Sequence, residues 1–503
     1  ERCSAMAHQL VSQYHLKAGD HVALIAENCP QYIEICFSLW YAGLVVVPIN
    51  AKLHPNELHY LLEDCSAKVC FSSKKLAPAT SLLVNEIITL QYNIIIGSQQ
   101  YLALEDSDLH FPCKVSPNDA AWIFYTSGTT GKPKCICHRS GGVLLQHLKE
   151  HQLHCNIKPN DNVFYFTTCG WMMWNWLVTA LASKASILLF DGFPMHKSPE
   201  LLLKIANKEK VTLFGISAKY IDQLIKQNVK VKEKIKLKFL KTICSTGSPL
   251  SKDGFEFVYR NIKKNVHLAS ISGGTDIVSC FVLGNLFQPV YAGEIQSPSL
   301  GIEIDILDDD GNSILSDEKG ELVVKKPFPS MPVKFWNDSD ETKIKSAYFE
   351  KYNNIWHHAD YIQKTKNKGY IIYGRSDATL KPGGVRIGTA EIYRQVESFE
   401  EISEALVVGQ NHNDDVRIVL FVKLKEGLVL NDELIKNIKS KIRKNCSPRH
   451  VPSIIKSCPD IPRTKSGKIV EIAVRKILNK QKINNIEALA NPEALEFFKN
   501  LKI

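Results

Sequence analysis

Short apolar runs alternate with amphipathic stretches along much of the chain. Residues 20–73 contain HVALIAEN, PQYIEICFSLWYAGL, VVVPIN, PNELHYLLEDC and AKVCFSS, which predicts strand, helix, strand, helix and strand. From residue 161 to residue 280 the alternation continues through NVFYFTT, SILLFDG, PELLLKIANKEK, VTLFGIS, KFLKTICSTG and VHLASISGG. Strands that alternate with helices of this length predict an α/β fold with doubly wound parallel sheets. Residues 81–108 are less regular and support no firm prediction.

Several predicted strands end in loops of small residues. Such loops cover residues 166–176, 245–251 and 271–280, and in open α/β sheets ligands bind at the carboxyl ends of strands. The apolar run AAWIFY predicts another buried strand, which leads into the loop YTSGTTGKPK at 125–134. A helical pattern at 141–154 then places this loop close to a helix N-terminus, where the helix dipole favours phosphate.

The pattern changes after residue 300. Residues 301–346 predict short antiparallel strands with Asp/Gly turns, as expected for a small β subdomain that ends a large domain. From residue 377 onward the chain predicts a compact α+β domain: a helix in TAEIYRQVESF, strands in EALVVGQ and RIVLFVKL, and a helix in NDELIKNIKSKIRKN. We place the boundary at 374–377, which gives domains 1–376 and 377–503.

The chain length and the net charge do not change this prediction of the fold. A chain of 503 residues exceeds the size of one hydrophobic core, so more than one domain is expected. The formal net charge is +10, with a denser belt of lysines at 204–241. No basic block with interleaved aromatic residues is present, so we predict a solvated lysine-rich surface and no nucleic-acid partner.

The cysteines point to a reducing compartment. Fourteen cysteines are scattered singly, often among apolar residues, which predicts reduced thiols in a cytoplasmic protein. Cys135, Cys137 and His138 lack a second pair at zinc-finger spacing and are expected to be strand residues. The apolar stretch 171–190 is interrupted by polar residues, so no integral membrane segment is predicted. No signal peptide is visible, and the start at Glu1 without a methionine leaves room for residues upstream.

The loop at 125–134 has the composition of a phosphate-binding loop. Its glycines let backbone N–H groups turn toward an anion, its hydroxyls add hydrogen-bond donors, and its lysines add positive charge. It is not a Walker A loop, because Pro133 follows the Gly-Lys pair where that motif needs Ser or Thr. The candidate polyphosphate-binding residues are Thr126, Ser127, Gly128, Thr129, Thr130, Gly131, Lys132 and Lys134.

This loop resembles the ATP-binding signature of the adenylate-forming superfamily of acyl-CoA synthetases, luciferases and adenylation domains. Four further stretches match the superfamily in the right order: STGSPLS (245–251), IWHHADY (355–361), YGRSDATLKPGGVRIGTAEI (373–392) and IPRTKSGKIVE (461–471). Chance matches multiply, so five motifs in one order are far more specific than one. The resemblance implies ATP, Mg²⁺ and coenzyme A as cofactors, and a small α+β C-terminal domain that is mobile.

The resemblance also implies roles for single residues in adenylation. Lys468 supplies the cation at the α-phosphate, Thr275 bonds that phosphate, and Asp276 stands where the family holds Mg²⁺. Asp360 accepts the ribose hydroxyls, and Arg375 contacts ribose or phosphate. The loop that stacks on adenine corresponds to Gly247, Ser248 and Pro249.

For the second step, the resemblance implies that the C-terminal domain rotates about Asp377. This rotation removes Lys468 and presents a glycine-rich loop to the coenzyme A thiol. The residues of that loop that the family pattern marks are Gly383, Gly384 and Arg386. Glycines there leave space for a pantetheine arm.

Four stretches resemble the acetoacetyl-CoA synthetases within the superfamily: 166–176, 271–280, 327–338 and 491–498. Gly273 stands where acetyl-CoA synthetases close their acyl pocket with tryptophan, so glycine implies room for a longer acid such as acetoacetate. The resemblance makes Trp171, Met172, Met173, Thr246 and Gly273 candidates to line the pocket, although aromatic and methionine runs are usually ordinary core.

The chain departs from the family in a few places. Residues 1–124 look more like generic acyl-CoA ligases, Ala359 replaces a usual glycine before the ribose aspartate, and Lys381 replaces a usual asparagine. Three alternatives stay open, the last of them because of the mixed character of residues 1–124. They are a ligase for another short carboxylate, an adenylation module that passes its acyl group to a carrier protein, and a non-enzymatic descendant. The sequence does not predict the oligomeric state.

Overall fold

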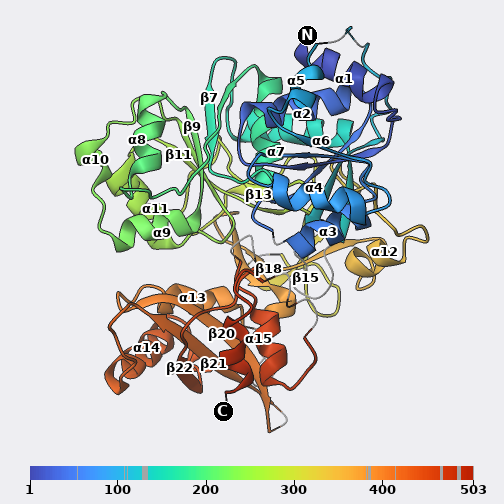
Figure 1. The fold of residues 1–503 in the computed structure, drawn as a ribbon. Helices are drawn as coiled ribbons and strands as arrows, with labels where there is room; N and C mark the ends of the chain where they lie inside the picture. Colours follow the sequence, from blue (N-terminus) through green and yellow to red (C-terminus); the bar gives the residue numbers. More distant parts are fainter. Residues whose placement is uncertain are drawn as a thin grey trace. The chain divides into compact units, whose positions relative to one another are not determined.

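The computed structural model describes residues 1–503 except 54, 107, 110, 127–133, 316, 381, 383–386, 414, 465–467, 484–485, 487–488 and 502. The described residues form two compact units, whose elements are labelled in Figure 1. Unit 1 comprises Glu1–Thr126, Lys134–Glu303 and Lys326–Asn353. Unit 2 comprises Ile304–Lys325 and Asn354–Ile503.

A seven-stranded sheet in the order β17-β6-β5-β2-β1-β3-β4 forms the first part of unit 1. Strands β1 to β5 are parallel where they pair, and β6 and β17 add an antiparallel edge. The strands are β1 (His21–Ile25), β2 (Val45–Pro48), β3 (Val69–Ser72), β4 (Tyr92–Ile95), β5 (Ala120–Thr126), β6 (Lys134–Arg139) and β17 (Lys334–Phe335). Its helices are α1 (Arg2–Ser12), α2 (Pro30–Tyr41), α3 (Pro55–Asp64), α4 (Ala77–Glu86), α5 (Gln99–Ala103) and α6 (Ser140–Lys149), which continues as the π-helix η1 (Glu150–His154).

A five-stranded, wholly parallel sheet in the order β11-β10-β9-β7-β8 forms the second part of unit 1. Its strands are β7 (Asn162–Tyr165), β8 (Ser186–Leu188), β9 (Leu213–Ser217), β10 (Thr242–Thr246) and β11 (His267–Ser270). The associated helices are α7 (Met172–Thr179), η2 (Ala180–Ser183), α8 (Leu201–Lys208), α9 (Ala218–Lys226), α10 (Val231–Lys234), α11 (Lys252–Phe257) and η3 (Val258–Ile262), and Figure 1 shows α8 to α11 beside this sheet. Helix α9 begins where the Ser217 side chain accepts a hydrogen bond from Tyr220 N.

A shared core joins the two sheets of unit 1. One cluster of buried side chains contains Val22 and Leu24 of β1 together with Val163 of β7 and Leu213 of β9. Trp174 and Trp176 of α7 belong to the same cluster and are fully buried. Unit 1 is completed by a small antiparallel sheet of β12 (Ser272–Gly274), β13 (Ser279–Leu283) and β14 (Ser297–Pro298), and by helix α12 (Thr342–Tyr348). The three predicted loops at 166–176, 245–251 and 271–280 therefore all follow strands of one parallel sheet.

Unit 2 contains two sheets in which most neighbouring strands are antiparallel. The first has the order β15-β16-β18-β19, with β15 (Ile304–Leu307), β16 (Lys319–Val324), β18 (Trp356–Lys364) and β19 (Tyr370–Arg375). The second has the order β20-β21-β22, with β20 (Ile402–His412), β21 (Asp415–Leu424) and β22 (Ile454–Ser457). The helical segments of unit 2 are η4 (Ser376–Ala378), α13 (Thr389–Val396), α14 (Asp432–Asn445), η6 (Pro448–His450), α15 (Glu471–Leu478) and α16 (Ala494–Lys499).

The predicted elements in 20–73, 161–280 and the C-terminal part are confirmed, and α4, β4 and α5 fill the stretch left without a prediction. The β subdomain after residue 300 groups with the C-terminal residues in unit 2. The predicted boundary at 374–377 lies inside unit 2, between its two sheets. The division into domains 1–376 and 377–503 stays a prediction.

Candidate active site

The phosphate-loop candidate joins the two strands of a hairpin. Thr126, the last residue of β5, pairs with Lys134, the first residue of β6. Ser127, Gly128, Thr129, Thr130, Gly131 and Lys132 lie outside the described residues, as do Gly383, Gly384 and Arg386 of the second glycine-rich loop. Strand β6 (KCICHR) separates the loop from helix α6 along the chain, and the predicted proximity of the loop to that helix N-terminus lies outside the described residues. Helix α6 begins only at Ser140, after Arg139 pairs with Ala120 at the opposite end of the hairpin.

Asp276 lies at the centre of a charged and aromatic group in unit 1. It lies with Thr275 in the turn between β12 and β13. The Lys134 ammonium lies 3.3 Å from Asp276 Oδ1, and the Tyr348 hydroxyl donates a hydrogen bond to the same oxygen. Lys134 Nζ also lies 4.7 Å from the centroid of the Tyr348 ring. The turn therefore carries a carboxylate beside the lysine that ends the candidate phosphate loop.

The imidazole of His138 lies near this turn, within the electrostatic reach of Asp276. Burial lowers the pKa of His138 to about 3, and the nearby Asp276 offsets only part of this effect. His138 is therefore neutral at physiological pH. Its ring stacks edge-on against Phe124 of β5, with 6.0 Å between the ring centroids. A neutral side chain therefore lies near Asp276.

A single carboxylate is enough to fit magnesium here. The described residues contain no group of three or more His, Cys, Asp and Glu side chains that could hold a metal ion. Mg²⁺ usually binds proteins through one or two carboxylates while substrate phosphates and water fill its other positions. Asp276 supplies such a carboxylate on a turn, so the residues fit a magnesium ion that arrives with a nucleotide.

The adenine-loop candidates follow strand β10. Gly247 has a φ of 91°, a left-handed conformation that favours glycine, and it turns the chain away from the sheet. Gly247, Ser248 and Pro249 are exposed, whereas Thr246 is buried and its hydroxyl donates a hydrogen bond to Ile271 O at 3.0 Å. Thr246 therefore ties the end of β10 to the segment that leads into β12.

Gly273 has a structural requirement of its own. It pairs with Cys280 of β13 at a register shift, and a Cβ atom at this position would overlap the carbonyl oxygen of Ser279. Close approach of two backbones therefore requires glycine here, whatever the acyl group. The interpretation that Gly273 opens an acyl pocket remains a prediction.

The other pocket candidates lie at the start of α7. Trp171 is the N-cap residue and is half-buried, and its ring contacts that of Tyr165 with 6.5 Å between the centroids. Met172 and Met173 are buried in the core that joins the two sheets. Trp171 is thus the most accessible of the three side chains.

In unit 2, β18 and β19 bring the ribose candidates together. Asp360 pairs with Arg375 across the two strands, and Arg375 Nη1 lies 3.5 Å from Asp360 Oδ1. Arg375 also donates to His358 O at 2.7 Å and lies 3.4 Å from the carboxylate of Asp377. Asp360 is largely buried, so its carboxylate is held in a fixed position.

Ala359 explains one departure from the family pattern. Its φ is 62°, in the left-handed region where a side chain is strained. The pairing of β16 with β18 shifts register at this point, because Glu321 faces Tyr361 while Val323 faces His357. The bulge places the strain directly before Asp360, which accounts for the usual glycine at this position.

The Lys468 loop has a well-defined base. Thr464 N donates to Lys468 O at 2.8 Å, and Lys468 N donates to the Thr464 hydroxyl oxygen at 3.0 Å. Lys468 itself is exposed, and residues 465–467 between them lie outside the described residues. Asn491 accepts a hydrogen bond from Arg463 N at 2.8 Å and donates to Asp460 and to Ile461 O.

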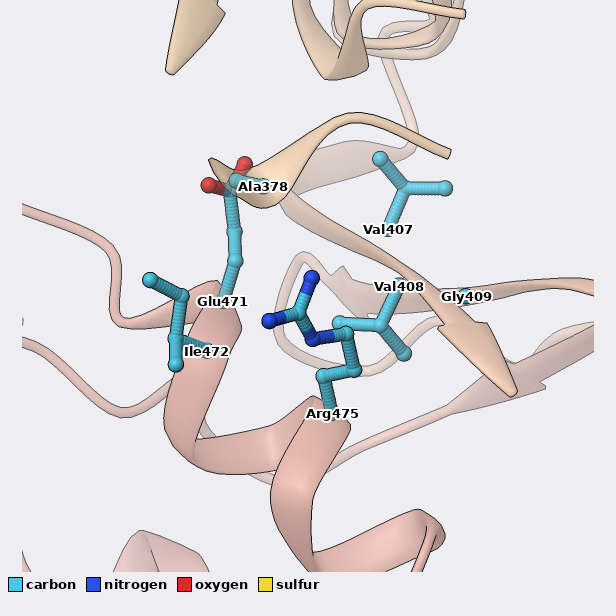
Figure 2. A pocket seen from close by; sticks show the side chains of 7 residues that line it. All are labelled: Ala378, Val407, Val408, Gly409, Glu471, Ile472 and Arg475. Atoms are coloured by element: carbon cyan, nitrogen blue, oxygen red, sulfur yellow. The ribbon is translucent and has the colours of Figure 1, made fainter. Parts of the chain in front are cut away.

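The hinge candidate Asp377 lies in the short helix η4. Arg475 of α15 donates from Nη1 to Asp377 O at 2.6 Å. A small pocket beside it is lined by Ala378, Val407, Val408, Gly409, Glu471, Ile472 and Arg475, and Figure 2 shows the side chains of Glu471 and Arg475 side by side on α15. Burial raises the pKa of Glu471 to about 7, and a hydrogen bond from the Tyr393 hydroxyl at 2.7 Å opposes this shift.

Four residues near the candidate site residues were not predicted from the sequence to lie there. They are Tyr348, His138 near the Thr275–Asp276 turn, Asn491 and Arg475. Tyr348 lies on a short helix that matches no motif, so no sequence signal marks it. Asn491 begins the stretch 491–498 that was noted only for its resemblance to the acetoacetyl-CoA synthetases. Its contacts with the base of the Lys468 loop arise from tertiary packing, so no sequence signal marks this role.

Family models match most of the chain. The model described as AMP-binding enzyme matches residues 1–331, and the model for the AMP-binding enzyme C-terminal domain matches residues 394–468. No helix among the described residues is long and apolar enough to cross a membrane.

Curated relatives and solved structures point to one group. The acetoacetyl-coenzyme A synthetase of Rhizobium meliloti is 55% identical over 381 residues, which are 76% of this chain and 58% of that protein. The acetoacetyl-CoA synthetase of Gallus gallus is 47% identical over 382 residues, which are 76% of this chain and 57% of that protein. The chain thus spans less than two thirds of the length of these relatives.

A solved acetoacetyl-CoA synthetase from Streptomyces lividans has a TM-score of 0.93 at 34% identity, and the match covers 99% of this chain and 80% of that one. An anthranilate CoA ligase in complex with anthranoyl-AMP has a TM-score of 0.83 at 20% identity, covers 95% of this chain and 92% of that one, and supports the fold alone. The predicted fold, an adenylate-forming enzyme with a large α/β part and a smaller C-terminal part, is confirmed. This chain belongs to the AMP-binding enzyme family, with homologues and a structural neighbour among the acetoacetyl-CoA synthetases.

Proposed function

We propose that this protein ligates acetoacetate to coenzyme A, with ATP converted to AMP and pyrophosphate through an acetoacetyl-adenylate. The observation that carries the proposal is the 55% identity to an acetoacetyl-coenzyme A synthetase over 381 residues. Those alignments leave about a quarter of the chain uncovered, which matches in size the stretch 1–124 that looks like a generic ligase. The acetoacetyl-like stretches all lie after that segment.

Adenylation needs positive charge and hydrogen-bond donors at the α-phosphate. The substrate carboxylate attacks the α-phosphorus, the bond to the bridging oxygen breaks, and pyrophosphate leaves with the electron pair of that bond. We assign the exposed Lys468 to the developing charge, Thr275 to the α-phosphate, and Lys134 with Thr126 and the loop to the β- and γ-phosphates. Asp276 would hold Mg²⁺, which neutralises phosphate charge when bound.

We assign the ribose to the β18–β19 strand pair and the adenine to the loop after β10. Asp360 has two carboxylate oxygens, which suit the two ribose hydroxyls, and Arg375 lies 3.5 Å from one of them. We assign the exposed segment Gly247, Ser248 and Pro249 to adenine. Trp171, Met172, Met173, Thr246 and Gly273 are the proposed surroundings of the acyl group.

Thioester formation requires a different set of groups. The coenzyme A thiol must attack the acyl carbonyl and expel AMP, which requires Lys468 to leave the site. We propose that residues 377–503 rotate about Asp377 and bring Gly383, Gly384 and Arg386 toward the thiol channel.

All fourteen cysteines are free and most are buried, which supports a reducing, cytoplasmic location.

A panel of short acids tests the substrate. Pyrophosphate release is measured with ATP, Mg²⁺ and coenzyme A for acetate, propionate, butyrate and acetoacetate, with Lys468→Ala as the inactive reference. We expect the highest kcat/KM for acetoacetate. Equal rates with butyrate would overturn the acetoacetate assignment, and pyrophosphate exchange without thioester product would favour a carrier-protein acceptor.

A further inference from the structure

Four titratable side chains are buried on one continuous helical segment of unit 1. His147 lies on α6, and Glu150, His151 and His154 lie on the π-helix η1 that continues it. All four are at most 3% exposed. Burial of a charged or polar group costs free energy unless partners satisfy it, and π-helical turns are frequent at functional sites. None of these residues has a role in the chemistry proposed above.

His147 holds the turn that follows Asp276. Its Nε2 lies 2.6 Å from Val278 O, and its Nδ1 lies 3.0 Å from the Thr179 hydroxyl oxygen. Burial lowers the pKa of His147, so the ring is neutral and carries one proton. A carbonyl oxygen only accepts, so the proton is on Nε2 and donates to Val278 O, while the Thr179 hydroxyl beside Nδ1 donates to Asn175 O at 2.8 Å.

Glu150 holds the first residues of β13. It accepts hydrogen bonds from the Ser279 hydroxyl and from Cys280 N, the latter at 3.3 Å. Trp176 Nε1 donates to its other oxygen at 2.9 Å, and the Lys149 ammonium lies 3.7 Å away. Burial alone would raise the pKa of Glu150, but the Lys149 charge and these donors outweigh it, so the pKa is lowered. Glu150 is therefore a buried carboxylate with its charge satisfied.

The turn between these contacts is strained. Val278 has a φ of 46°, and for a β-branched residue the left-handed region is unfavourable. Such strain persists only where surrounding contacts fix it. Thr275 and Asp276 lie in the same turn, three and two residues before Val278, respectively. Contacts at Val278, Ser279 and Cys280 thus fix the segment that carries both proposed phosphate and metal ligands.

We propose that His147 and Glu150 are positioning residues that hold the Thr275–Asp276 turn for MgATP. This inference rests on the proposed role of that turn in adenylation. Neither side chain touches the nucleotide in this proposal; each acts through the backbone or side chain of 278–280. Loss of either contact releases the strain at Val278 and moves the Asp276 carboxylate away from its position beside Lys134.

His147→Phe and His151→Phe form a matched pair. Both histidines are fully buried on the same segment, and His151 packs edge-on against Trp176 with 4.1 Å between the ring centroids. Both substitutions keep an aromatic ring, but only His147→Phe removes a hydrogen bond to Val278 O. We expect His147→Phe to weaken MgATP binding in calorimetry, and to raise the KM for MgATP, by about tenfold. His151→Phe is expected to change the MgATP affinity and the KM for MgATP by less than about threefold.

Two further variants separate positioning from general damage. His147→Gln retains an N–H near the position of Nε2 and is expected to restore most of the MgATP affinity. Glu150→Gln turns an amide toward donors and is expected to lose affinity as His147→Phe does, with thioester formation from supplied acetoacetyl-adenylate less affected. Equal MgATP affinity in the two phenylalanine variants, or no rescue by glutamine, would overturn the proposal. MgATP binding is measured without any acid, so the result is independent of whether acetoacetate is the substrate.

Discussion

Thr464 and Lys468 close the base of the Lys468 loop with two hydrogen bonds, Thr464 N to Lys468 O at 2.8 Å and Lys468 N to Thr464 Oγ1 at 3.0 Å. The backbone of the lysine is therefore fixed, while its side chain is exposed and able to reach a ligand. An ammonium presented in this way can support one half-reaction and be absent from the next, which is what adenylation followed by thioester formation requires.

Lys468→Ala is expected to lower adenylation by about 10²- to 10³-fold, because one fixed charge at the developing negative charge is lost. ATP–pyrophosphate exchange measures this step. Thioester formation from supplied acetoacetyl-adenylate is expected to stay within about threefold of the wild-type rate, since the proposed mechanism removes Lys468 from the site before this step. Lys482→Ala, at an exposed position of the same unit, is the control. Equal loss in both half-reactions would rule out the assigned role.

Asn491→Ala is expected to reproduce part of the Lys468→Ala effect. The substitution removes the acceptor for Arg463 N and the donor to Asp460 and Ile461 O, which together hold the start of the loop. We expect a fall of about tenfold in pyrophosphate exchange, with the thioester step retained. Asn500→Ala, whose side chain donates only locally to Glu496 O, serves as the comparison. An unchanged exchange rate would show that the loop base does not depend on Asn491.

Ala359→Gly is expected to stabilise the protein. Glycine adopts a φ of 62° without the clash that alanine has there, so the free energy of unfolding should rise by about 1 kcal/mol. Glycine also increases the entropy of the unfolded chain, so the gain is smaller than the strain relieved. Urea denaturation measures the change. Ala473→Gly in helix α15 should shift the midpoint in the opposite direction, and a destabilised Ala359→Gly would refute the strain argument.

Glu471 predicts a pH dependence of stability. Its pKa is about 7 in the folded protein against an ordinary value of 4.5, so between these values the folded protein binds more protons than the unfolded chain. The free energy of unfolding therefore falls as the pH rises from about 4.5 to about 7, by on the order of 2 kcal/mol. Glu471→Gln should remove this contribution and be more stable than the wild type at pH 8. Identical pH profiles in urea denaturation would contradict the prediction.

Asp377→Pro tests the hinge. Proline fixes φ at residue 377 and disfavours the helical conformation of Ser376, so η4 can no longer change freely. We expect adenylation to be reduced modestly and thioester formation to be reduced by at least about 100-fold. Single-turnover measurement of both steps gives the ratio. A parallel loss in both would indicate damage to η4 and no hinge function.

Most of the fold could be predicted from the sequence, because the apolar runs of β1 to β3 and β7 to β11 are short, buried and separated by amphipathic helices. The motifs also identified the ends of the right strands, such as Thr246 and Thr275. Long-range partners could not be predicted. Tyr348, His147 and Asn491 reach their sites through tertiary packing, and no local pattern indicates that a side chain from α12 will meet Asp276. Strand β6, formed by KCICHR, separates the loop from helix α6 along the chain.

The close approach at Gly273 has a consequence for protein engineering. A designer who wishes to convert a long-acid pocket into a short-acid pocket would place tryptophan at this position, by analogy with acetyl-CoA synthetases. In this backbone any side chain there meets the carbonyl of Ser279, the residue whose hydroxyl contacts Glu150. If Gly273 borders the acyl group as predicted, acyl selectivity and the geometry of the Asp276 turn depend on the same few atoms. A change of substrate at this position would require redesign of the whole β12–β13 hairpin with its support from α6 and η1.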